Sequence, residues 1–226
     1  MAILTANQLS KVYGHKQKYR ALNNISFSVE KGEFVAVMGP SGSGKTTLLN
    51  VLSSIDTISG GTVEVEGKEI NKLSHKEVAN FRKQHLGFIF QDYSVLPTLT
   101  VKENIMLPLS VQKVGKEEMN RRYNRIVEAL NISDISDKYP SELSGGQRQR
   151  TSAARAFINL PSIIFADEPT GNLDGQTAQE IERLLFDLNK ELGTTLILVT
   201  HDRNLAGLCQ RHVELNDGRL KTVQGS

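Results

Sequence analysis

A run of small residues between an apolar segment and a helical one has the composition of a phosphate-binding loop. It follows the apolar segment 34–38 and reads Gly39-Pro40-Ser41-Gly42-Ser43-Gly44-Lys45-Thr46-Thr47. Glycines let backbone N–H groups turn towards a polyphosphate, while Lys45 is suited to neutralise its oxygens and the Thr46 hydroxyl to ligate Mg²⁺. The helix expected over 46–52 points the positive end of its dipole at the same anion. The loop therefore predicts a bound nucleotide; the alternative is a glycine-rich turn without a ligand.

Two adjacent carboxylates and a histidine follow two further apolar segments. Asp167 and Glu168 come after 163–166, and His201 comes after 196–199. Ligands of open parallel sheets bind at the carboxyl ends of the strands, so we expect these side chains near the phosphate loop. One carboxylate could bind Mg²⁺ and the other could polarise an attacking water, while His201 is placed to contact the γ-phosphate. Taken singly, each also fits an ordinary polar turn at the end of a strand.

A second predicted helix begins with the residues of a cap. Ser144 is expected as its N-cap, two glycines follow, and the helix runs on through the alanines at 153, 154 and 156. A helix N-terminus attracts anions, so Ser144, Gly145, Gly146 and Gln147 form a second candidate anion site. The alternative is a well-capped helix that carries a basic turn.

Composition limits the class of protein. The chain has 226 residues, of which 38% are hydrophobic, and a net charge of +2 from 27 basic and 25 acidic residues. That balance creates no general field for nucleic acid, so no nucleic-acid partner is expected. Cys209 is the only cysteine, the first seven residues lack the pattern expected of a signal peptide, and no apolar run is long enough to span a bilayer. We expect a cytoplasmic location.

The remaining patterns predict an α/β fold. Segments 25–29 and 63–67 alternate as half-buried strands, and the buried run 86–90 leads into Gln91. From about 92 to 142 the chain is expected to be helical, and a later helix should bury residues 181, 184, 185 and 188. A hairpin is expected over 213–220 on the Asp217-Gly218 turn. Strands that alternate with helices imply a mainly parallel central sheet, here with an N-terminal antiparallel β subdomain.

With these motifs in order, the chain resembles the ATP-binding-cassette (ABC) ATPases over essentially its whole length. Six segments carry the resemblance: the Walker A loop Gly39 to Thr46, the glutamine loop at Gln91, the signature Leu143 to Gln147, the Walker B strand Ile163 to Glu168, the D-loop Asn172-Leu173-Asp174 and the switch histidine His201. Tyr13 matches the aromatic residue that stacks on adenine. Asn172 departs from the alanine or serine frequent at its position, while Asp174 is kept.

The resemblance implies a P-loop NTPase fold, an activity and a set of roles. One nucleotide-binding domain is expected over 1–226, with an α-helical subdomain inserted at about 92–150. ATP and Mg²⁺ are the expected cofactors, and two copies are expected to pair head to tail so that each signature sequence covers the ATP of the other copy. Catalysis is assigned to Glu168, His201, Gln91 and Lys45, metal binding to Thr46, Gln91 and Asp167, and nucleotide binding to Tyr13, residues 39–47, Ser144, Gly145, Gly146, Gln147 and Asp174.

Within the family, segments 47–56, 81–91 and 166–174 are most similar to the macrolide-export and lipoprotein-release group, and above all to its bacitracin-resistance type of antimicrobial-peptide transporter. This likeness implies an ATPase subunit that powers a separate membrane permease and is peripheral on the inner face of the membrane. The alternatives are a lipoprotein-release ATPase, or a regulatory ATPase of the cell-division type that moves no cargo. The apolar segment 93–109, including Leu96 and Val101, is either subdomain core or the surface that accepts the permease.

Overall fold

The computed structural model describes residues 1–14 and 17–225, and the chain forms two compact units. The first contains residues 1–82 and 195–226, and the second contains residues 83–194. Helix α2 (His75–His85) runs across the boundary between them. None of the helices in the described ranges is long and apolar enough to cross a membrane.

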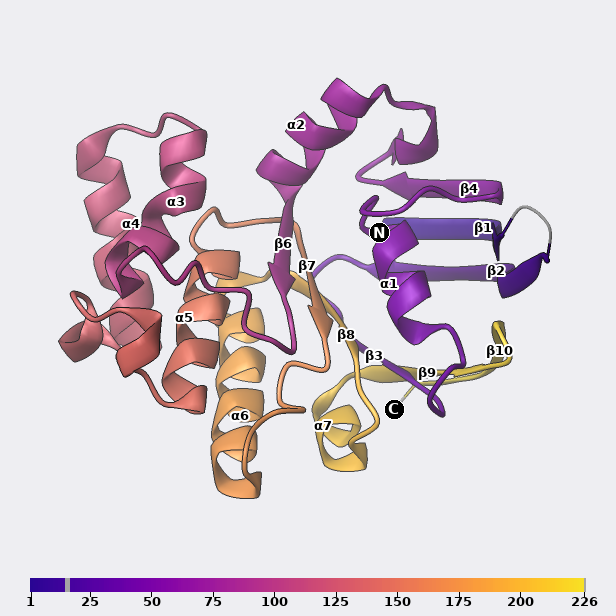
Figure 1. Cartoon of the computed structure of the whole chain (residues 1–226). Coiled ribbons are helices and arrows are strands. Elements are labelled where there is room, and N and C mark those ends of the chain that lie inside the picture. The colour runs from indigo at the N-terminus through magenta and orange to yellow at the C-terminus, as the bar shows by residue number, and fades with distance from the viewer. Residues whose placement is uncertain (15–16, 226) are drawn as a thin grey trace. The chain divides into compact units, whose positions relative to one another are not determined.

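The first unit contains an antiparallel sheet with the order β2-β1-β4-β5 (Figure 1). Its strands are β1 (Ala2–Tyr13), β2 (Tyr19–Glu30), β4 (Gly60–Val65) and β5 (Lys68–Glu69). Ile25, Phe27 and Val29 are buried and alternate with exposed residues, as the period of two predicts. The expected N-terminal antiparallel sheet is confirmed.

The same unit carries the strand that precedes the phosphate loop. Strand β3 (Phe34–Met38) pairs in parallel with β8 (Thr195–Val199) on one side and with β9 (Arg211–Asn216) on the other. Strand β10 (Arg219–Gly225) returns antiparallel to β9, and Asp217 and Gly218 both have positive φ (48° and 68°), as a type I′ hairpin turn requires. Helices α1 (Lys45–Leu52) and α7 (Arg203–Leu208) and the 3-10 turn η1 (Ile70–Lys72) complete this unit.

The second unit is built around two parallel strands, β6 (Leu86–Ile89) and β7 (Ile163–Asp167). Helix α5 (Gly145–Phe157) approaches β6 closely at Gly87. A side chain at that position would start 2.7 Å from the Ala156 carbonyl oxygen, so only glycine fits. Apart from the antiparallel pair of β9 and β10, the strand pairs outside the N-terminal antiparallel sheet are parallel. The α/β fold predicted from the sequence is therefore confirmed.

The other helices of the second unit are α3 (Val101–Val111), α4 (Lys116–Ala129) and α6 (Gly175–Leu192), with 3-10 turns η2 (Ser133–Ile135) and η3 (Pro140–Glu142). The buried residues of α4 are Tyr123, Ile126 and Val127. Residues 92–100, expected within a helical region, form a non-helical loop instead. The reason is a capping box: the Thr100 hydroxyl accepts from the Glu103 amide, and the Glu103 carboxylate accepts from the Thr100 amide, which starts α3 at Val101.

Candidate nucleotide-binding site

The predicted phosphate loop is folded around its own lysine. Helix α1 begins at Lys45, directly after Gly44 with a φ of 101°. The Lys45 Nζ donates to the carbonyl oxygens of Gly39 (2.8 Å) and Pro40 (2.9 Å). The loop thus curls back over the start of the helix, and Gly42, with a φ of 77°, has nothing within 4 Å of the position a side chain would occupy. This is the shape of an open anion cradle.

Packing explains why the ends of this loop are glycines. A side chain at Gly39 would start 2.0 Å from the Leu215 carbonyl oxygen, and one at Gly44 would start 2.7 Å from the Ala21 carbonyl oxygen. In the described part of the chain, the buried Ser43 hydroxyl has no hydrogen-bond partner. Since buried hydroxyls are normally paired, an oxygen-rich ligand fits a loop that holds such a group.

His201 lies close to the beginning of this loop. It follows β8, which is the parallel neighbour of β3, and the two strands are in register from Phe34 and Leu196 onwards. Met38, Gly39, Pro40 and His201 line one cavity of about 540 Å³, together with Arg203 and His212. Two strand ends that are far apart in sequence therefore deliver polar groups to the same hollow.

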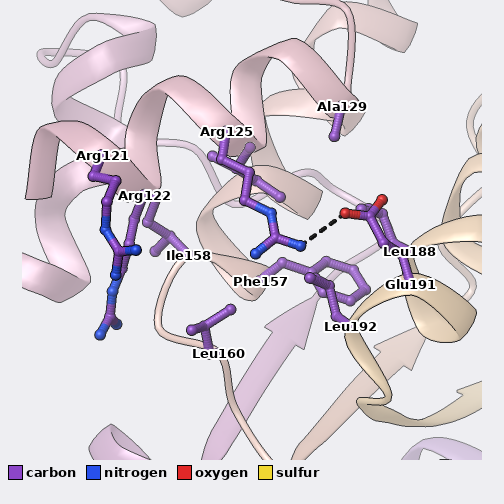
Figure 2. A pocket seen from close by; sticks show the side chains of 11 residues that line it. Arg121, Arg122, Arg125, Ala129, Phe157, Ile158, Leu160, Leu188, Glu191 and Leu192 are labelled. Carbon is purple, nitrogen blue, oxygen red and sulfur yellow. Dashed lines mark hydrogen bonds and ion pairs between the residues drawn. The ribbon is translucent and has the colours of Figure 1, made fainter. Parts of the chain in front are cut away.

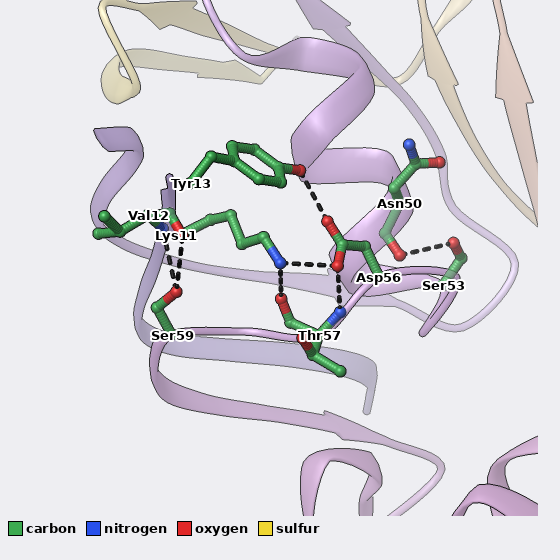
Figure 3. Close-up of polar contacts among 8 residues, drawn as sticks. All are labelled: Lys11, Val12, Tyr13, Asn50, Ser53, Asp56, Thr57 and Ser59. Carbon is green, nitrogen blue, oxygen red and sulfur yellow. Dashed lines mark hydrogen bonds and ion pairs between the residues drawn. The ribbon is translucent and has the colours of Figure 1, made fainter. Parts of the chain in front are cut away.

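Tyr13, expected to stack on adenine, stands at the end of β1 and is 39% exposed. Its hydroxyl donates to the Asp56 Oδ2 (2.7 Å), and the Lys11 Nζ donates to the Asp56 Oδ1 (2.6 Å) and to the Thr57 carbonyl oxygen (2.6 Å), as Figure 3 shows. Lys11 and Asp56 were missed by sequence reasoning. The available signal was that residues two apart on a strand share a face, which places Lys11 beside Tyr13.

In the second unit, Asp167 ends the buried strand β7 and Glu168 follows with a φ of 43°. A left-handed conformation is uncommon for a glutamate, and such strain is concentrated at functional sites. The side chains of Glu168 and Gln91 both lie close to Gly171. A Cβ atom at Gly171 would be 3.2 Å from the Glu168 Oε2 and 2.9 Å from the Gln91 Nε2. Two of the predicted catalytic side chains therefore flank one glycine.

The D-loop residue that departs from the family pattern contacts the glutamine loop. The Asn172 Nδ2 donates to the Gln91 carbonyl oxygen (2.8 Å), and the Gln91 Nε2 donates to the Asn172 Oδ1 (3.3 Å). The Tyr93 hydroxyl donates to the Asn172 carbonyl oxygen (3.4 Å), and the Arg148 guanidinium lies 5.2 Å from the centre of the Tyr93 ring. Sequence reasoning took Tyr93 only as the first residue of the apolar segment 93–109, whereas in the structure it links the D-loop to the signature helix.

The signature sequence begins α5 as predicted. The Ser144 hydroxyl accepts from the Gln147 amide (3.2 Å), and the Gln147 Oε1 accepts from the Ser144 amide (3.0 Å). Gly146 lies against α6, where a side chain would start 2.6 Å from the Thr177 Cγ2. Asp174 caps α6 by accepting from the Thr177 amide (3.1 Å), and this bond, with a second from the Thr177 hydroxyl, holds the pKa of Asp174 below its usual value.

The expected Mg²⁺ donors are oxygen atoms of mixed type. No group of three or more His, Cys, Asp or Glu side chains suited to a metal occurs in residues 1–14 and 17–225. The donors assigned from the sequence are instead the Thr46 hydroxyl, the Gln91 amide oxygen and the Asp167 carboxylate. Mg²⁺ prefers oxygen ligands and is usually held by one or two carboxylates, with waters and phosphate oxygens as its other ligands. A set of three oxygen donors with one carboxylate fits this ion.

The segment after Gln91 has one exposed apolar residue and a fixed backbone. Leu96 is 42% exposed, whereas Val101 is completely buried and is therefore not a surface residue, contrary to one of the two options for it. The buried side chain of Asn104 holds the loop: its Oδ1 accepts from the Leu96 amide (2.7 Å), and its Nδ2 donates to the carbonyl oxygens of Leu96, Leu99 and Thr100 (3.0 Å each).

A second cavity contains none of these motif residues. It is lined by residues of α4 and α6, and Figure 2 shows Arg125 of α4 pointing towards Glu191 of α6, while Arg121 and Arg122 extend along the other side. The cavity is small, about 70 Å³, and the ion pair between the Arg125 Nη2 and the Glu191 Oε1 (2.8 Å) crosses it. A nucleotide does not fit there.

Known proteins are similar to this chain in sequence and in fold. The family model described as "ABC transporter" matches residues 22–171. The chain is 54% identical to the bacitracin export ATP-binding protein BceA of Halalkalibacterium halodurans, over 98% of this chain and 88% of that one. It is 40% identical to the lipoprotein-releasing system ATP-binding protein LolD of Bacteroides thetaiotaomicron, over 94% and 96% of the two chains. The cassette MJ0796, solved as a dimer in a post-hydrolysis state with ADP and Pi, superposes with a TM-score of 0.90 at 36% identity and 98% coverage of both chains.

Proposed function

The chain belongs to the ABC transporter family, and we propose that it is the ATP-binding and ATP-hydrolysing subunit of an exporter that acts on antimicrobial peptides. One observation carries the ATPase assignment: the loop of Gly39 to Thr46 curls over Lys45 and contains a buried Ser43 hydroxyl without a hydrogen-bond partner among the described residues. The cargo class is supported by the 54% identity to a bacitracin export subunit, against 40% to a lipoprotein-releasing one. No observation favours a regulatory ATPase without cargo.

The side chains divide the work of hydrolysis. Lys45 and the backbone of residues 39–47 hold the phosphates, and Tyr13 stacks on adenine. Thr46, Gln91 and Asp167 hold Mg²⁺, which when bound neutralises the charge of the phosphate oxygens. Glu168 accepts the proton of the attacking water, and its strained backbone fixes the direction of the carboxylate.

Charge that develops on the transferred phosphoryl group needs donors. Gly145, Gln147 and Asp174 are assigned to nucleotide binding alone, with Asp174 as an acceptor. The charge is stabilised by donors from His201 of the same chain and from Ser144 and Gly146 of a second copy. A capped helix start such as that of α5 is suited to this task because its first amides are unpaired within the helix. We therefore propose a homodimer, which the dimeric state of MJ0796 supports.

Further proposals concern the domain organisation, the partners and the location of the protein. Residues 1–226 form a single nucleotide-binding domain, with the helical subdomain at about 92–150. An integral membrane permease docks on the segment after Gln91, where Leu96 is exposed. The protein lies on the cytoplasmic face of the membrane through that permease, and it binds no nucleic acid.

The assignment of the general base is tested with Glu168→Gln. Loss of the base is expected to lower kcat by about 10²- to 10⁴-fold while ATP still binds, because the amide keeps the shape of the side chain. ATP hydrolysis is measured by phosphate release and ATP binding by calorimetry. Glu128→Gln, an exposed change on α4, is the matched control and should behave as wild type. Turnover near the wild-type rate in Glu168→Gln would refute the role of Glu168, and saturating ATP should convert this variant to dimers in sedimentation.

A further inference from the structure

A buried lysine and an aspartate surround the side chain expected to receive adenine. Lys11 is only 6% exposed, and its ammonium lies 4.8 Å from the centre of the Tyr13 ring. Asp56 accepts from both residues, one on each carboxylate oxygen (Figure 3). A cation over an aromatic face attracts the ring, and the hydrogen bond at the hydroxyl holds the tip of the side chain in place. The ring is therefore held at one face and at its tip.

Tyr13 keeps exposed surface although one ring face and the hydroxyl are engaged. Lys11 covers one face, the hydroxyl is engaged by Asp56, and the residue is still 39% exposed. A ring whose orientation is already set loses little freedom when a planar base stacks on it.

Asp56 is itself fixed by the helix that carries the phosphate loop. Helix α1 begins at Lys45, and after its end the amides of Ile55 and Asp56 both donate to the Asn50 carbonyl oxygen (2.9 and 3.1 Å). An α-helix rises 1.5 Å per residue, so the eight residues of α1 set a span of about 12 Å between the phosphate loop and this turn. One rigid element thus bears the groups for both ends of a nucleotide.

We propose that Lys11 and Asp56 form a positioning pair that presents one face of Tyr13 to the nucleobase and thereby sets the affinity for adenine nucleotides. The inference rests on the proposed function, because it assumes that Tyr13 stacks on the base of ATP. It assigns no chemical step to either residue. It predicts that the pair acts on the base end of the ligand and leaves binding of the phosphates alone.

The test compares ATP with inorganic tripolyphosphate, which has no base. Calorimetry with the full chain gives the Kd of each ligand for wild type, Lys11→Met and Tyr13→Phe. Loss of the cation in Lys11→Met should weaken ATP about 2- to 30-fold, and loss of the hydroxyl in Tyr13→Phe about 2- to 10-fold, with tripolyphosphate unchanged in both. Lys72→Met breaks an exposed pair with Glu69 in the same unit and should change neither affinity.

The outcomes separate the two levels of the argument. Weaker ATP binding with unchanged tripolyphosphate binding supports the positioning pair. Unchanged ATP binding by folded Lys11→Met overturns it, and so does equal weakening of both ligands, which would mean that Lys11 only stabilises the fold. If Lys11→Met does not fold, Tyr13→Phe still tests the proposal, because it removes only the hydroxyl of a partly exposed residue. If the wild-type chain bound no ATP, the proposed function itself would fail.

Discussion

Replacing Arg155 by methionine should loosen the turn that follows the glutamine loop. Arg155 lies in the last turn of α5, and its Nη1 donates to the Ser94 carbonyl oxygen (2.8 Å). Burial lowers the pKa of Arg155, against the charge of Asp92, which raises it. Tyr93 and Ser94 both have positive φ, 66° and 47°, and such residues keep this conformation only when neighbours enforce it.

The expected loss of stability can be worked out from these contacts. A hydrogen bond from a charged donor contributes about 1.5–3 kcal/mol, and the second contact, from the Arg155 Nη2 to the Tyr93 carbonyl oxygen, is too long at 3.5 Å to add much. Methionine keeps most of the apolar packing. The free energy of unfolding should therefore fall by about 2–3 kcal/mol, which for a chain of this size lowers Tm by about 4–12 °C.

Two measurements check this expectation. Thermal unfolding gives the change in Tm, and hydrogen exchange gives the protection of the amides in 92–96, which should decrease more than that of α6. The control is Arg183→Met on the exposed side of α6, which should lower Tm by no more than about 2 °C. An unchanged Tm together with unchanged exchange in 92–96 would refute the view that Arg155 maintains the turn.

Two other predictions concern docking and pH. Leu96→Asp should reduce co-purification with the permease at unchanged Tm, because Leu96 is exposed. Val101→Asp should instead unfold the chain, because Val101 is buried. Full retention of the permease by Leu96→Asp would contradict the docking proposal. For Asp56, burial alone would raise the pKa, but hydrogen bonds from Lys11, Tyr13 and Thr57 outweigh it and lower the pKa. The stabilisation by this carboxylate is thus complete above the unfolded pKa of about 3.9 and is lost as the pH falls through the lower folded value. Unfolding curves from pH 6 to pH 2 should show a steeper loss for wild type than for Asp56→Asn.

The motif residues were predictable because each depends on local sequence. The cap at Ser144, the buried strand before Asp167 and the Asp217-Gly218 turn follow from short-range patterns, and the structure has all three. The apolar segment 93–109 was harder, since an apolar run does not indicate which of its members face inwards. The Thr100 and Glu103 capping box was present in the sequence and would have placed the helix start correctly.

The contacts that orient the site residues could not be predicted in the same way. Asp56 meets Lys11 across 45 positions of the chain, and Asn172 meets Gln91 across 81. Such pairings depend on how strands and loops come together, which one sequence does not contain. Lys11 resembled any charged residue on a half-exposed strand until its burial and its partner were known.

The four hydrogen bonds of Asn104 change the thermodynamics of docking at Leu96. Fixing the backbone of a residue costs about 1–2 kcal/mol, so ordering a mobile loop of the length of 96–100 at the moment of contact would cost about 5–10 kcal/mol. Asn104 already holds Leu96, Leu99 and Thr100 in place within the folded chain. A partner that covers Leu96 therefore loses little of its binding energy to ordering, and a small contact area is enough for a specific, reversible complex.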